Sequence, residues 1–266
     1  MNERHSRQTF LGPRSPDIIA NVRVGVVGLG GGGSHIVQQL AHIGLQHFVI
    51  YDHDVVEESN LNRLVGATAQ DVLDANLKTN IAERMIRNLN LEANCRVITK
   101  RWQEESEHLM TCDVIFGCVD SFQEREQLER FARRFLIPYI DIGMDVLAQG
   151  NHFLITGQVV RSIPGEPCLW CLGVINKKLI AEEAKKYDAA GHNPQVVWSN
   201  GVLASTAVGL FMEMITPWHK LGRPVACLEY DGNAQTLEPS NVLGVVNDSE
   251  CPHYSPKEVG DPFFVR

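Results

Sequence analysis

The chain has 266 residues, of which 44% are hydrophobic and 21% are charged, and its formal net charge is −8. This composition is typical of a globular protein, and the acidic balance argues against a nucleic-acid-binding surface. No run of about 18 apolar residues occurs, so no membrane-spanning helix is expected. The seven cysteines form no disulfide framework and the N-terminus has no apolar signal core, which together favour a cytoplasmic protein.

Residues 1–21 form a polar arm that carries Arg4 and Arg7. The arm precedes the first expected strand, and chain termini are usually poorly ordered unless they are packed. The residues alone leave open whether the arm frays, folds back or reaches a partner subunit.

The stretch from Val22 to Arg63 organises the rest of the chain. It predicts a strand over 22–27, a glycine turn, a helix over 34–44 and a second strand over 47–51 that ends in an acidic residue. Such a unit binds nucleotides, because glycines admit phosphates close to the backbone and the helix amides face the anion. The nucleotide-binding positions of this stretch are Gly28, Gly30, Gly31, Gly33 and Asp52. The glycine motif alone serves NAD, FAD and ATP alike.

Strands and helices then alternate up to residue 141, which predicts a Rossmann-like, doubly wound, mostly parallel α/β sheet. The expected helices cover 76–91, 104–110 and 122–135, and the expected strands cover 95–99, 113–119 and a segment from 138. Beyond this point, the extended segments at 149–161, 225–230 and 234–238 predict an antiparallel C-terminal extension. Two later helices are expected over 177–187 and 201–215, with a flexible connection over 188–194.

Four charged residues distinguish between the possible nucleotides: Arg7, Arg63, Lys78 and Asp120. In adenylate transfer a carboxylate attacks the α-phosphate of ATP, which calls for magnesium, an acid to hold it and several cations. Hydride transfer instead needs a nicotinamide beside a proton donor. The charged set favours an ATP site over an NAD site.

The motifs resemble those of the ThiF/MoeB/HesA superfamily, the enzymes that activate ubiquitin-like proteins. The match runs in order from residue 4 to about 240. The matching blocks are R-x-x-R-Q at 4–8, G-x-G-G-x-G at 28–33, D-x-D with S-N-L-x-R at 52–63, C-x-D with a following arginine at 118–125, a zinc knuckle at 165–171 and the long helix at 201–214.

The resemblance implies a role for each matching residue. Asp52 would bind the ribose of ATP with Asp54 beside it, and Asn60, Arg63 and Lys78 would hold the phosphates. Asp120 would support Mg²⁺ and the adenylation step. Arg7 would reach the γ-phosphate bound by the neighbouring subunit of a homodimer.

The resemblance also implies the substrate and the domain division. The substrate would be the C-terminal carboxylate of a small ubiquitin-like β-grasp protein, and the products would be an acyl-adenylate and pyrophosphate. The adenylation domain would cover 22–240, with a crossover loop at about 172–198, followed by a tail over 241–266.

The sequence departs from the family pattern at two active-site positions and in the zinc motif. Lys78 follows Ala-Asn-Leu instead of a glycine turn, and Ser121 stands where the family has asparagine. Cys168 and Cys171 have zinc-knuckle spacing, but the second pair is only Cys251 and His253. One intervening residue tends to direct two side chains to opposite sides of an extended chain, although Pro252 could bend it. A Cys₃His zinc site and a metal-free pair of buried thiols both remain open.

No cysteine lies between Cys171 and Cys227, so the crossover loop has no thioester nucleophile. We favour direct attack on the adenylate by a partner's cysteine, sulfur donor or amine. The partner would be a conjugating enzyme or a sulfur-carrier protein, as in a bacterial ubiquitin-like conjugation system. The alternatives are that Cys171 or Cys227 serves, or that the enzyme stops at adenylation. Other hypotheses are adenylation of a peptide or small carboxylate, an NAD-dependent oxidoreductase, and a non-catalytic binding subunit.

Overall fold

The computed structural model describes residues 3–186, 194–219, 225–246 and 251–254. The expected connection over 188–194, apart from residue 194, and most of the tail after 246 therefore lie outside the described residues. Within the described residues, no helix is long and apolar enough to cross a membrane.

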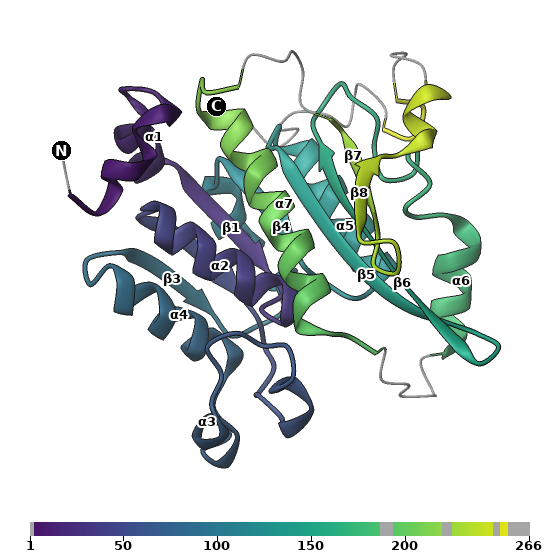
Figure 1. The fold of residues 1–266 in the computed structure, drawn as a ribbon, viewed down its shortest axis with the longest axis horizontal. Helices are drawn as coiled ribbons and strands as arrows, with labels where there is room; N and C mark the ends of the chain where they lie inside the picture. Colours follow the sequence, from purple (N-terminus) through teal and green to yellow (C-terminus); the bar gives the residue numbers. More distant parts are fainter. Residues whose placement is uncertain (1–2, 187–193, 220–224, 247–250, 255–266) are drawn as a thin grey trace.

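An eight-stranded sheet forms the centre of the molecule, in the order β3-β2-β1-β4-β5-β6-β7-β8 (Figure 1). The first five of these strands pair in parallel, and the pairs from β5 to β8 are antiparallel. The doubly wound sheet with an antiparallel extension is thus confirmed. The strands are β1 (Arg23–Val27), β2 (His47–Tyr51), β3 (Asn94–Ile98), β4 (Val114–Gly117), β5 (Tyr139–Gln149), β6 (His152–Ser162), β7 (Cys227–Asp231) and β8 (Thr236–Pro239).

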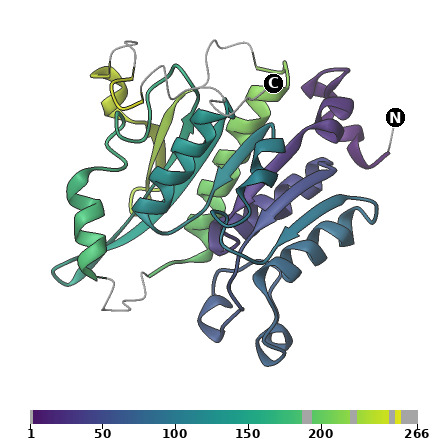
Figure 2. The same ribbon diagram turned by 180° about the vertical axis from the view of Figure 1, so that it is seen from behind.

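Helices cover both faces of the sheet. One face carries α2, α4 and α7, and the opposite face, which is turned toward the viewer in Figure 2, carries α5. The helices are α1 (Ser15–Asn21), α2 (Gly31–Ile43), α3 (Ala69–Leu73), α4 (Lys78–Leu89), α5 (Phe122–Arg134), α6 (Lys177–Lys186) and α7 (Val197–Ile215). Short 3₁₀ helices occur at η1 (Glu3–Leu11), η2 (Glu58–Asn60), η3 (Ser106–Thr111) and η4 (Asn241–Gly244).

Two of the expected helices begin earlier than the sequence pattern indicates. Helix α2 begins at Gly31 instead of Ser34, so the glycines themselves form its first turn. Tertiary packing requires small residues there, since a Cβ on Gly33 would lie 1.9 Å from the carbonyl oxygen of Gly28. Helix α7 begins at Val197 instead of Gly201, and its buried side of Leu203, Ala207 and Leu210 matches the expected apolar spacing.

The N-terminal segment folds back onto the domain. After η1 and α1 the chain enters β1 directly, and Leu11 and Ile19 are buried in the same core as α2 and α7. Burial of these two side chains fixes the segment against the body of the protein.

Candidate functional site

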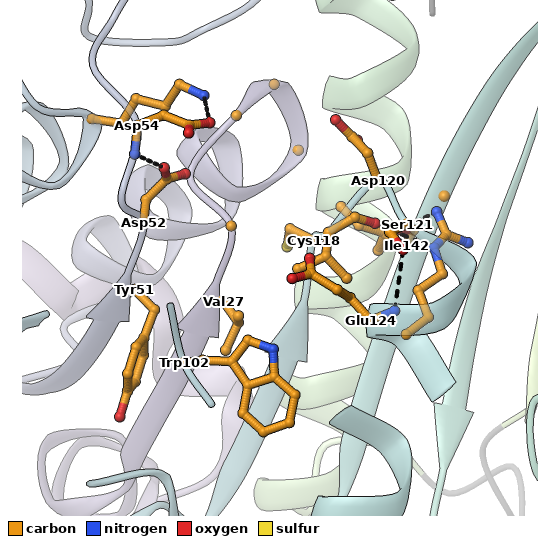
Figure 3. A pocket seen from close by; sticks show the side chains of 18 of the residues that line it. Val27, Tyr51, Asp52, Asp54, Trp102, Cys118, Asp120, Ser121, Glu124 and Ile142 are labelled. Atoms are coloured by element: carbon orange, nitrogen blue, oxygen red, sulfur yellow. Dashed lines mark hydrogen bonds and ion pairs between the residues drawn. The ribbon is translucent and has the colours of Figure 1, made fainter. Parts of the chain in front are cut away.

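A pocket of about 550 Å³ opens at the carboxyl ends of β1, β2 and β4. Strand order reverses between β1 and β4, and ligands of open α/β sheets bind at such switch points. Figure 3 shows Asp52 and Asp54 on one side of the pocket and Asp120 on the other. The volume is in the range of small-molecule and cofactor sites.

The glycine turn forms the floor between these acids. Gly28 has a φ of +86°, and a Cβ there would lie 2.5 Å from the carbonyl oxygen of Cys118. Gly30 caps α2, and a Cβ on it would meet no atom within 4 Å. The open turn and the unpaired amides of a helix start are suited to binding an anion.

Asp52 is held rigidly at the end of β2. Its Oδ2 accepts a hydrogen bond from the N–H of Leu29 at 2.7 Å, and its Oδ1 accepts one from the N–H of Asp54 at 2.9 Å. Burial raises the pKa of this carboxyl, while the charge of Lys78 and the two N–H donors work in the opposite direction. The bond to Leu29 ties the acid to the glycine turn.

Lys78 enters the pocket from the start of α4. Its Nζ donates a 2.7 Å hydrogen bond to Oδ2 of Asp54. Burial alone would raise the pKa of Asp54, but the hydrogen bond and charge of Lys78 outweigh it, so the pKa lies below its usual range. The structure thus brings Asp52, Asp54 and Lys78 together as the sequence predicts.

Asn60 and Arg63 line the same pocket from the η2 turn. Asn60 Oδ1 accepts from the N–H of Glu57 at 3.1 Å, which closes a capping box. Arg63 Nη1 donates to the carbonyl oxygen of Ser59 at 2.7 Å. Among the described residues, no carboxylate lies within ion-pair distance of this guanidinium.

Asp120 lies exposed at the pocket mouth, three residues after the end of β4 at Gly117. Gln195 Nε2 donates to its Oδ1 at 3.2 Å, and the Gln195 carbonyl accepts from Asn62 Nδ2 at 3.1 Å. Beneath it, the buried Arg125 donates through Nε to the carbonyl oxygen of Val119 at 3.2 Å. The Arg125 bond thus holds the backbone next to the acid, and the Gln195 bond holds its side chain.

The pocket residues that the sequence did not predict include Trp102, Glu183 and Gln195. Glu183 and Gln195 belong to the crossover segment expected at about 172–198. That expectation was the sequence signal that could have located them. Trp102 follows β3 with no motif around it, so nothing in the sequence pointed to it.

Arg7 does not belong to this pocket. The ring of its neighbour His5 packs against Gly44, where a Cβ would lie 2.8 Å from the ring. Gly44 caps the C-terminus of α2, whereas the pocket lies at its N-terminus, and 13 helical residues span about 20 Å. Arg7 is therefore remote from the pocket of its own chain.

The four zinc-ligand candidates come together in one cluster. The sulfur atoms of Cys168, Cys171 and Cys251 lie 3.3–3.6 Å apart, and His253 Nδ1 lies 3.3–4.0 Å from them. Ligands about 2.3 Å from a tetrahedral zinc would be about 3.8 Å apart, so the donors fit such an ion. The side chains of Cys251 and His253 thus face the same centre as the two knuckle cysteines.

Two of the remaining cysteines, Cys118 and Cys227, are poor nucleophiles. Cys118 lines the pocket, but burial raises the pKa of its thiol well above the ordinary range. Burial likewise raises the pKa of Cys227 to about 11. Since thiolates are the reactive form, neither residue is set up to capture an acyl group.

Comparisons with known proteins agree with this geometry. The model of the ThiF family matches residues 3–252. The SAMP-activating enzyme E1 of Haloferax volcanii is 31% identical over 64% of this chain and 61% of its own length, and the sulfur carrier protein ThiS adenylyltransferase of Bacillus subtilis is 29% identical over 65% and 51%. The chain thus spans about half to three fifths of these relatives.

Among solved structures, E. coli MccB with ATP superposes with a TM-score of 0.73 at 20% identity, covering 91% of this chain and 72% of that one. This likeness concerns the fold. With a family match over almost the entire sequence, and with the nucleotide motifs gathered in one pocket, the chain belongs to the ThiF family.

Proposed function

We propose that this protein activates the C-terminal carboxylate of a ubiquitin-like β-grasp protein by ATP-dependent adenylation. The observation that supports the proposal most strongly is that one pocket contains the glycine turn, the ribose-side acid Asp52, the cations Arg63 and Lys78, and Asp120. The two curated relatives named above are, by name, an activating enzyme and an adenylyltransferase.

In the proposed reaction, an oxygen of the substrate carboxylate attacks the α-phosphorus of ATP. The bond from that phosphorus to the bridging oxygen breaks, and pyrophosphate leaves with the bonding electrons. Lys78, Arg63 and Asn60 would bind the phosphate oxygens, on which negative charge builds up, and Asp52 would accept hydrogen bonds from the ribose. Asp52, Asn60 and Arg63 need little reorganisation because backbone contacts already hold them. Lys78 is held by its hydrogen bond to Asp54.

Two metals belong to the proposal. Mg²⁺ would neutralise charge on the triphosphate, and we assign Asp120 to hold it, since its exposed carboxylate lines the pocket mouth. Zn²⁺ would bind at the Cys168, Cys171, Cys251 and His253 cluster and would have a structural role, because four protein ligands leave no open position for chemistry.

The next step of the reaction depends on whether a cysteine of this chain can attack the adenylate. The pocket cysteine Cys118 is held as a thiol by burial, and the three sulfurs of the cluster face the metal centre. We therefore propose that a partner's cysteine, sulfur donor or amine attacks the carbonyl carbon of the adenylate directly, and that AMP leaves with the electrons of the broken carbon–oxygen bond. The partner would be of the conjugating-enzyme or sulfur-carrier class.

The test is exchange of labelled pyrophosphate into ATP in the presence of Mg²⁺ and candidate β-grasp proteins that end in Gly-Gly. Exchange that needs both components supports the proposal. A parallel set of short peptides and small carboxylates tests the alternative substrate class. If ATP binds but no candidate of any class promotes exchange, the proposed adenylation is wrong.

A matched pair of variants assigns the reaction to this pocket. Asp120→Ala should abolish exchange while preserving the fold. Asp74→Asn, which changes an exposed acid outside the pocket, should leave exchange unchanged. Thermal stabilisation by NAD, without any by ATP, would instead favour an oxidoreductase.

A further inference from the structure

The cluster of three cysteines and one histidine is assembled from two segments that are about 80 residues apart in the sequence. Cys168 and Cys171 lie on one segment and Cys251 and His253 lie on the other. Both segments lie against the side of α5, which also begins at the pocket with Ser121 as its N-cap. Side chains of α5 therefore connect the two segments.

Glu129 of α5 contacts both segments with a single carboxylate. Its Oε1 accepts a 2.9 Å hydrogen bond from the N–H of Leu169, which lies between the two cysteines of the knuckle. Its Oε2 accepts a 2.9 Å hydrogen bond from the hydroxyl of Tyr254, the residue after His253. The side chain is fully buried, so both oxygens depend on these protein donors.

Arg133, one helical turn further along α5, supports the same arrangement. Its Nη2 donates to Ser162 Oγ at 2.8 Å and to the carbonyl oxygens of Glu166 and Pro167 at 3.0 and 3.1 Å, just before the knuckle. Its guanidinium also lies 5.1 Å from the centre of the Tyr254 ring. The Ser162 hydroxyl then donates to Glu129 at 2.5 Å, which closes the network.

We propose that Glu129 is a positioning residue for a Cys₃His metal centre, and that its hydrogen bond to Tyr254 holds Cys251 and His253 against the knuckle. The inference rests on the zinc centre included in the proposed function. Buried hydrogen-bond partners around a metal site keep its ligands oriented, and their loss typically weakens metal binding by about 10- to 100-fold.

The test is cobalt and zinc affinity of the full-length chain after removal of metal with a chelator. The wild-type protein should bind one Co²⁺ per chain with the visible absorption of a tetrahedral thiolate site. Tyr254→Phe removes only the hydroxyl that donates to Glu129, and it should weaken cobalt and zinc binding by about 10-fold or more. Glu129→Gln, which loses an acceptor for either Leu169 or Tyr254, should weaken binding at least as much.

The matched control is Tyr51→Phe. Tyr51 is also a buried tyrosine, and its hydroxyl donates a 2.7 Å hydrogen bond to the carbonyl oxygen of Glu105, away from the cluster. Its loss should leave metal affinity unchanged. Tyr254→Phe is the deciding variant if Glu129→Gln fails to fold.

Two results would overturn the inference: a wild-type chain that binds no metal at the thiolates, or equal metal affinities for Tyr254→Phe and the wild type. An equal loss of affinity in Tyr51→Phe would also contradict it, since the effect would then be general. Pyrophosphate exchange is measured separately, so failure of the metal centre and failure of the adenylation proposal can be told apart.

Discussion

Glu183 of α6 accepts a 3.1 Å hydrogen bond from the hydroxyl of Ser121 at the start of α5. The N–H groups of Phe122 and Gln123 donate to the same carboxylate at 3.1 and 3.2 Å. These are amides that the first turn of a helix leaves without an intrahelical partner, and the helix dipole favours an anion there. The contact fastens α6 to the turn that follows Asp120.

Replacement of Ser121 tests the importance of this turn for stability. Ser121 Oγ also caps α5 by accepting from the N–H of Glu124 at 3.3 Å. Ser121→Ala loses both contacts and should lower the free energy of unfolding by about 1 kcal/mol, measured by urea denaturation.

The control for this prediction is Ser121→Asn, which introduces the residue typical of the family. Asparagine caps helices about as well as serine, so this variant should stay within about 0.5 kcal/mol of the wild type. Equal stability of the alanine variant and the wild type would show that neither contact matters in solution.

Lys78→Met should reduce pyrophosphate exchange strongly. Lys78 is the cation paired with Asp54 inside the pocket, and removal of one group that stabilises charge in a transition state costs about 100-fold or more in turnover. The exchange assay above measures it with any substrate that the wild type accepts. Lys178→Met changes a lysine whose side chain is 83% exposed on α6 and should retain full exchange. A Lys78→Met enzyme with wild-type exchange would remove this residue from the mechanism.

The sequence predicts the features of the fold and the site that depend on local sequence patterns. Alternating strands and helices require a parallel sheet, and the carboxyl ends of parallel strands meet at one edge. The residues that follow β1, β2 and β4 therefore had to converge, which is why Asp52 and Asp120 line one pocket as expected.

Other features depend on contacts between distant segments. Glu183 reaches Ser121 across 62 positions in the sequence, and no local pattern encodes such a contact. The Cys251–His253 pair illustrates a local rule that fails: in an extended chain the two side chains would diverge, but residues 252–254 form a turn that brings both donors to one centre. The sequence pattern placed the glycines before the helix, whereas their close approach to Gly28, Ile142 and Asn200 makes them the first turn of α2.

Arg7 provides a test of a shared active site. It lies at the far end of α2 from the pocket of its own chain, so we expect it to act on the pocket of a second copy. In a two-fold symmetric dimer, Arg7→Ala and Asp120→Ala homodimers should each be inactive in exchange, and an equal mixture should recover about a quarter of wild-type activity. Each mixed dimer would then contain one intact site.

The control for the mixture is a chain that carries both substitutions, which should restore nothing when it is mixed with either single variant. Sedimentation analysis of the same samples reports whether chains associate. An Arg7→Ala protein with full exchange activity, or a monomeric wild-type chain with full activity, would disprove this arrangement.

Asp71 supports the loop that leads to Lys78, and its contribution to stability should depend on pH. Arg84 donates to both carboxylate oxygens at 2.7 Å, and Asn76 Nδ2 donates to Oδ1 at 3.0 Å. The hydrogen bonds from Arg84, followed by those from Thr68 and Asn76, hold the pKa of Asp71 well below its usual range. Asp71→Asn should therefore lower the free energy of unfolding at neutral pH by about 2 kcal/mol.

The sign of the pH effect follows from the lowered pKa. A carboxyl whose pKa is lower in the folded state stabilises the fold above its unfolded pKa of about 3.9, and this contribution is lost as the pH falls toward the folded value. The difference between the wild type and Asp71→Asn should be constant between about pH 7 and pH 5 and should shrink below about pH 4. Urea denaturation at several pH values measures it, with Asp74→Asn as the exposed control in the same loop. A difference that stays constant far below about pH 4 would mean that the ionised Asp71 carboxylate is not its source.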